Sequence, residues 1–208
     1  MAKKDKRRLV ERVYEALNDL VAKQIVAVDF VRFDRIGDTI VSQGTKDALN
    51  RSDTIKTYVK ATHWIDSFWY YVNVRIKKDE DGQNELPFVS VSFFQDIDGV
   101  LNQLFRAEWD NFKQSIHPQP HWHLSNLTDD SFEDLAQKEE LNKDNPFAEL
   151  IENSPRVDIP KMHFAMAGNW HEAQKEMMVV EYSDEKQLAQ WLVNLFDHVR
   201  EQLVYAKS

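Results

Sequence analysis

Histidines concentrate in one short stretch of the chain. Residues 116–124 read IHPQPHWHL and hold three of the seven histidines. Imidazole nitrogens bind transition metals and exchange protons near neutral pH. His121 and His123 are one residue apart, so on a β-strand their side chains would share a face and lie about 7 Å apart. The spacing suits metal chelation or proton transfer, although His-x-His also occurs by chance in many sequences. His117, in the proline-containing turn before them, is a weaker candidate.

The preceding predicted strand, residues 103–110, would supply charged partners. One face of this strand is apolar, with Phe105, Ala107 and Trp109, and the other carries Arg106, Glu108 and Asp110. If residues 103–110 pair antiparallel with residues 121–124, the two histidines join the charged face. His163 would join it too, provided that its predicted strand at 161–168 belongs to the same sheet.

Two chemistries suit such a group, and a structural role is the simpler alternative. The candidate ligands for zinc or another divalent metal, which could activate water, are His121, His123 and His163. Without a metal, the candidate residues for general acid and base catalysis are His121, His123, Glu108, Asp110 and Arg106. In the structural interpretation, the histidines line a hydrogen-bonded sheet surface and Glu108 pairs with Arg106 across strands. No cofactor is predicted beyond such a metal.

Hydrophobic periodicity predicts an α+β fold with a mainly antiparallel, twisted sheet of about five to six strands. Alternating apolar residues at 68–76 and 89–93 flank the polar turn DEDGQNE, which is typical of a hairpin. Further strands are predicted at 24–33 and 176–182, whereas residues 34–66 are ambiguous.

Both ends of the chain show the apolar stripe of an amphipathic helix. The first helix is predicted at 5–23, and the last follows Ser183, which would be its cap. Both helices are expected to cover one face of the sheet. No linker or repeat is visible, so residues 1–208 are interpreted as a single α+β domain. An acidic, partly helical insertion is predicted around 125–160, with a helix near 130–141.

Composition excludes several classes of site. The chain has no cysteine, so it has no disulfide, thiolate ligand or cysteine nucleophile. Its five glycines form no G-x-G-x-x-G or P-loop pattern, and the G-x-S-x-G and H-E-x-x-H motifs are also absent.

Charge and hydropathy indicate the compartment and the partners. The formal net charge is −9, although the first twelve residues are basic. The acidic body argues against broad nucleic-acid binding, while the basic N-terminus could contact a phosphate or an acidic partner. No apolar run approaches the roughly 18 residues that span a membrane, and the N-terminus lacks the apolar segment of a signal peptide. A cytoplasmic location without a membrane partner is therefore predicted.

Two functions are consistent with the sequence. The first is a protein-interaction module or accessory subunit of a larger assembly, favoured by the aromatic-rich sheet and the lack of a specific catalytic motif. The alternative is a small histidine- or metal-dependent hydrolase, similar to a phosphodiesterase or nuclease, that uses His121, His123 and Glu108.

Overall fold

The computed structural model describes seven parts of the chain. They comprise residues 8–21, 32–52, 55–78, 85–110, 119–124, 164–165 and 182–205. The predicted acidic insertion at 125–160, its helix, and almost all of the predicted strands at 24–33 and 176–182 lie outside these residues, as do His117 and His163.

Two helical segments lie at the ends of the described chain. The first is α1 (Leu9–Ala16), which continues into the π-helical turn η1 (Leu17–Val21). The second is α5 (Glu185–Tyr205). The cap of α5 differs from the prediction: the Asp184 carboxylate accepts the backbone N–H of Gln187 at 2.8 Å, whereas Ser183 contacts the Gln187 side chain. None of the described helices is long and apolar enough to cross a membrane.

Nine strands make up the described sheet, rather than the predicted five to six. They are β1 (Phe33–Ile36), β2 (Thr39–Ser42), β3 (Lys46–Ser52), β4 (Ile55–Ile65), β5 (Phe68–Lys78), β6 (Glu85–Ile97), β7 (Val100–Trp109), β8 (His121–Leu124) and β9 (Phe164–Ala165). Their order is β1-β2-β5-β6-β7-β8-β9; β4 also pairs with β5, and β3 joins only through β4. All the pairs are antiparallel, which confirms the predicted class and the β5–β6 hairpin. The additional strands come from the ambiguous segment 34–66.

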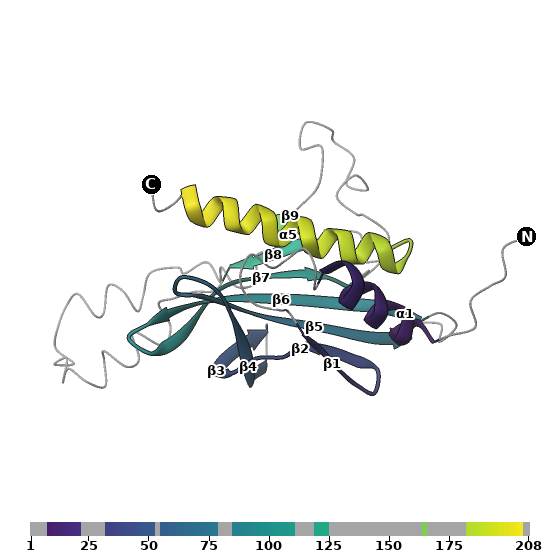
Figure 1. Cartoon of the computed structure of the whole chain (residues 1–208), viewed down its shortest axis with the longest axis horizontal. Helices are drawn as coiled ribbons and strands as arrows, with labels where there is room; N and C mark the ends of the chain where they lie inside the picture. The colour runs from purple at the N-terminus through teal and green to yellow at the C-terminus, as the bar shows by residue number, and fades with distance from the viewer. Residues whose placement is uncertain are drawn as a thin grey trace, which may run out of the picture.

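Helix α5 contacts one face of the sheet through an aromatic side chain. The Phe196 ring of α5 lies 5.0 Å from that of Trp64, 4.9 Å from Tyr70 and 5.3 Å from Phe93. Buried residues of α1 belong to the same hydrophobic cluster. Figure 1 shows α5 lying along β5 to β7, with α1 beside it.

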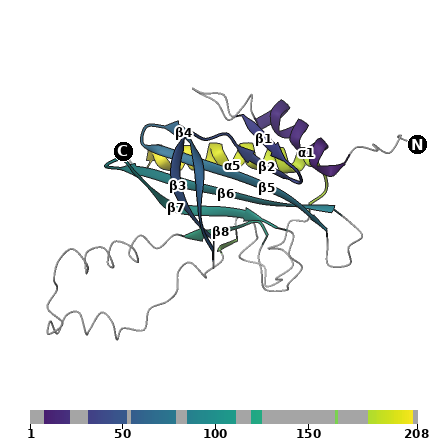
Figure 2. The same cartoon turned by 90° about the horizontal axis from the view of Figure 1, so that it is seen from below.

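The β3–β4 hairpin lies on the other face of the sheet. Figures 1 and 2 show β3 and the first half of β4 crossing β6 and β7 on the side opposite α5. A second small cluster fills part of the space between them, formed by Ala48, Ala61, Phe94 and Leu101. The face that carries the charged residues is therefore covered by chain rather than open.

Gly44 allows this hairpin to pack closely. The connection from β2 to β3 runs against β4, where the backbone N–H of Thr45 donates to the carbonyl of Ala61 at 2.9 Å. A Cβ atom at Gly44 would lie only 2.0 Å from the backbone oxygen of Lys60. A side chain at position 44 would therefore push the two backbones apart.

We predict that Gly44→Ala destabilises the protein by about 1–3 kcal/mol, the usual cost of forcing atoms into a packed region. The matched control is Gly37→Asn, because Gly37 has φ +62° and open space around its Cβ position, and asparagine tolerates this conformation. Urea unfolding of both variants measures the difference. Equal stability of Gly44→Ala and the wild type would contradict the close approach.

Candidate metal centre

The register of β7 and β8 brings the predicted site together. Glu108 lies opposite His121 and Arg106 lies opposite His123 in the antiparallel ladder. Cross-strand partners project from the same face of a sheet, so the four side chains share the face that the β3–β4 hairpin covers. Strand β9 pairs with β8 through Ala165 and His121, as expected for the predicted strand at 161–168.

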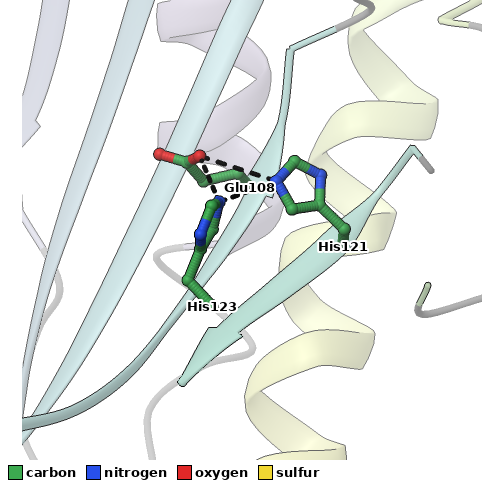
Figure 3. A group of neighbouring side chains, drawn as sticks. All are labelled: Glu108, His121 and His123. Atoms are coloured by element: carbon green, nitrogen blue, oxygen red, sulfur yellow. Dashed lines mark hydrogen bonds and ion pairs between the residues drawn. The ribbon is translucent and has the colours of Figure 1, made fainter. Parts of the chain in front are cut away.

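Three potential ligand atoms converge on one point (Figure 3). The Nε2 atoms of His121 and His123 are 2.8 Å apart. Oε2 of Glu108 lies 2.9 Å from Nε2 of His123 and 3.7 Å from Nε2 of His121. The side chains are nearly inaccessible, with exposed fractions of 0% for His121, 5% for His123 and 9% for Glu108. The histidine rings therefore turn toward each other and toward the carboxylate in the protein interior.

The size of this triangle fits a metal ion. Zinc binds histidine nitrogen and carboxylate oxygen at about 2.0–2.2 Å. A circle through three atoms separated by 2.8, 2.9 and 3.7 Å has a radius of about 1.9 Å, so one point just outside their plane lies at about 2.05 Å from all three. The corresponding ligand–metal–ligand angles run from about 85° to about 130° at that distance. The three atoms could bind one ion without a rearrangement of the backbone.

Hydrogen bonds among the three ligand atoms satisfy their lone pairs only in part. A neutral imidazole carries one N–H and one lone pair, and an ionised carboxylate has only lone pairs. One proton on Nε2 of His123 can be shared between Glu108 and His121, but a second proton at Nε2 of His121 would point at the first. A proton on one of these atoms is shared with one or two neighbours, whereas a bound cation would contact all three atoms.

An ion pair holds the carboxylate in place. Nε of the buried Arg106 lies 2.8 Å from Oε1 of Glu108. Arg106 and Glu108 are neighbours on one face of β7, so the pair is within one strand, not across strands as the structural interpretation assumed. The arginine contacts one carboxylate oxygen, and the other faces the histidines.

The surroundings of Glu108 favour its ionised form. Burial by itself would raise the pKa of Glu108, but the hydrogen bond from His123 and the charge of Arg106 act in the opposite direction. The net effect holds the pKa of Glu108 at about 2, below its usual 4.5. The carboxylate is therefore charged, and able to bind a cation, throughout the neutral range.

The structure separates the predicted site residues into three groups. Glu108, His121 and His123 converge, and they form a cluster of potential ligands whose atoms lie within 4.8 Å of one another. Asp110 does not belong to this cluster; it follows the end of β7, and its carboxylate accepts a hydrogen bond from Gln119. A part for Asp110 in catalysis therefore stays a prediction. His163 lies outside the described residues.

Two contacts of the site were missed by the sequence interpretation. Arg106 donates through Nη1 to the backbone carbonyl of Arg51 on β3, at 2.5 Å. Gln103 bonds both the N–H and the carbonyl of Arg51, at 2.7 and 3.2 Å. These bonds involve the main chain of β3, so no residue type in the segment 46–52 signals them.

We predict that Glu108→Gln costs about 3–5 kcal/mol at neutral pH, because the buried Arg106 loses its counter-charge. The pKa of Glu108 is lowered in the folded state, so its stabilising effect is complete above 4.5 and is lost as the pH falls toward 2. The stability difference between wild type and Glu108→Gln should therefore be constant above pH 5 and shrink below it. Denaturant unfolding in the presence of a chelator measures it, with the exposed Glu201→Gln as control. A difference independent of pH down to 2.5 would contradict this assignment.

No protein-family model, curated protein or solved structure matches the chain in the three comparisons with known proteins. Its function therefore has to be inferred from the geometry of this cluster.

Proposed function

We propose that this protein binds one divalent transition-metal ion, zinc by preference, through Glu108, His121 and His123. The observation that carries the proposal is the convergence of one carboxylate oxygen and two imidazole nitrogens within 2.8–3.7 Å of one another. Two of the three ligands agree with those predicted from the sequence. Glu108 replaces His163 as the third ligand among the described residues.

The donor atoms favour zinc and its neighbours over hard cations. Imidazole suits zinc, copper, iron and nickel, whereas calcium and magnesium prefer six or more oxygen ligands. Only one carboxylate oxygen faces the centre, since Arg106 contacts the other. A site with two nitrogens and one oxygen would therefore bind magnesium or calcium weakly.

Burial strengthens the attraction between the cation and its ligands. The three side chains are at most 9% exposed, and charge interactions grow as the local dielectric falls. The positive charge of Arg106 nearby acts in the opposite direction, because it repels the metal ion. Its binding also displaces any proton shared among the ligand atoms.

A hydrolytic use of the metal is the second candidate function. Two histidines and one glutamate are the ligands of several zinc hydrolases, in which a fourth position holds water. A phosphodiester or another small ester would be the substrate class. The exposed fractions of 0–9% leave little access for a macromolecular substrate, so a structural role for the metal is the stronger version of the proposal. A structural metal is compatible with the interaction-module hypothesis, which stays a prediction.

We predict one zinc ion per chain in the wild type and a loss of at least 100-fold in affinity for His123→Ala, because removing one of three ligands also opens the site to water. Metal-free protein titrated with zinc in competition with a chromogenic chelator gives the affinity, and elemental analysis gives the stoichiometry. Cobalt(II) should bind at the same site and give the intense visible bands of a low-coordinate ion.

The matched controls are His63→Ala and His198→Ala. Both histidines are exposed, and His63 bonds the carbonyl of Asp66 rather than a carboxylate. These variants should bind zinc like the wild type. A wild type that binds no zinc, or an equal loss in the controls, would contradict the proposal.

The hydrolytic candidate predicts that zinc-loaded wild type cleaves bis(p-nitrophenyl) phosphate faster than the metal-free protein, and that His123→Ala abolishes the difference. Release of p-nitrophenolate measures the rate. Zinc-loaded protein without turnover would contradict hydrolysis of this diester and leave the structural role of the metal as the proposed function.

A further inference from the structure

Arg106 connects the metal ligand to the β3–β4 hairpin. Its guanidinium is buried, with a side-chain exposed fraction of 4%. One nitrogen, Nε, lies 2.8 Å from Oε1 of Glu108 in an ion pair, and another, Nη1, donates a hydrogen bond to the Arg51 carbonyl of β3 at 2.5 Å. Arg106 of β7 thus contacts both a ligand of the proposed metal centre and the main chain of β3.

Arginine is well suited to make both contacts with one side chain, because its donors are held in a rigid plane. The guanidinium is planar and presents five N–H donors in fixed directions, so it can face two acceptors at once. Lysine has the same charge but a single nitrogen on a flexible chain. It could neutralise Glu108 or reach the Arg51 carbonyl, but it would not fix their relative positions.

Further hydrogen bonds attach the hairpin to the sheet at the same residue, Arg51. Gln103 pairs with both the N–H and the carbonyl of Arg51. The neighbouring Asn50 accepts a hydrogen bond from Ser92 of β6 at 2.6 Å. At the other end of β3, Lys46 forms an ion pair with Asp96 at 2.5 Å. The Arg51 end and the Lys46 end are therefore two separate attachments of one strand.

We propose that Arg106 is the positioning residue of the metal centre: it fixes Glu108 as a ligand through one oxygen, and it couples metal binding to the docking of β3 on the sheet. The proposal rests on the proposed function, since it requires metal at Glu108, His121 and His123. Arg106 thus controls metal binding without being a metal ligand itself.

The two roles have different consequences. A carboxylate whose Oε1 is held by Arg106 offers Oε2 alone, which keeps the coordination number low and favours zinc over manganese. The link to Arg51 makes metal binding and hairpin docking mutually supportive. By thermodynamic reciprocity, the factor by which zinc favours the docked hairpin equals the factor by which docking favours zinc.

The test is Arg106→Lys, which keeps the positive charge. Repulsion between this charge and the metal changes little, so a change in zinc affinity reports the loss of the guanidinium geometry. Substitutions that disturb partners of metal ligands commonly reduce affinity about 10–100-fold. We expect a zinc affinity at least 10-fold weaker, a smaller preference for zinc over manganese, and weaker visible bands of bound cobalt(II) as Glu108 becomes free to bind through both oxygens.

Hydrogen exchange at the Arg51 amide tests the coupling. This N–H donates to Gln103, so its exchange reports the docking of β3. Zinc should slow the exchange several-fold in the wild type and have no effect in Arg106→Lys. Gln103→Ala loosens the same anchor without touching Glu108 and should weaken zinc binding several-fold. Lys60→Gln, which removes an exposed ion pair to Asp47 within the hairpin and leaves its attachments to the sheet in place, is the matched control and should bind zinc normally.

The outcomes distinguish this proposal from the proposed function. A wild type without zinc binding overturns both. Zinc binding that is equally tight and equally selective in Arg106→Lys, with the Arg51 amide still protected by zinc, overturns the positioning role and leaves the metal centre intact. If Arg106→Lys does not fold, Gln103→Ala decides: an unchanged zinc affinity there overturns the coupling.

Discussion

The contact between Arg106 and Glu108 is the interaction on which this side of the protein depends. Placing two unit charges in a protein interior costs several kcal/mol per ion, and the cost is recovered only when each charge meets its partner at close range. Arg106 and Glu108 are two positions apart on one strand, so they meet without any long-range folding event. The groups that pack around them have to preserve this ion pair. The histidines of β8 approach the second carboxylate oxygen, and the Arg51 carbonyl of β3 accepts a hydrogen bond from Nη1 of the arginine.

The two faces of the sheet are buried by different means. On one face, rings of β5 and β6 pack on Phe196 of α5, and the interaction is mostly hydrophobic. On the other face, the β3–β4 hairpin has only a small apolar cluster around Phe94 and Leu101. Farther along β7 its contacts become hydrogen bonds to Gln103 and Arg106, and the ligand cluster follows at Glu108. The hairpin thus contacts this face through polar groups as well as apolar ones, and the ligand cluster beyond these contacts is buried too.

Much of the site was predictable from the sequence because strand parity leaves little freedom. Once residues 103–110 and 121–124 are antiparallel neighbours, Glu108 and the two histidines must share a face. The details at the strand ends were not predictable in this way: Asp110 has the parity of Glu108 but lies beyond the end of β7. Leu124, the last residue of β8, is 41% exposed although its parity places it on the same face as Trp122. The β3–β4 hairpin was not predicted for another reason. Segment 34–66 lacks a clear period, and its attachment uses the backbone of Arg51, which has the same chemistry whatever side chain is present.

The distance between the histidines shows what the fold adds to a common motif. Side chains two residues apart on a strand begin about 7 Å apart, yet the Nε2 atoms of His121 and His123 are 2.8 Å apart. Bringing the rings together restricts two side chains and turns two ring nitrogens toward an oxygen of Glu108. That arrangement is unfavourable unless something positive lies among the three atoms. A shared proton supplies part of the required charge, and a divalent metal supplies more of it at the same place. The convergence, rather than the His-x-His spacing, is therefore the feature that favours a metal, since spacing alone would leave the rings apart on an ordinary sheet surface.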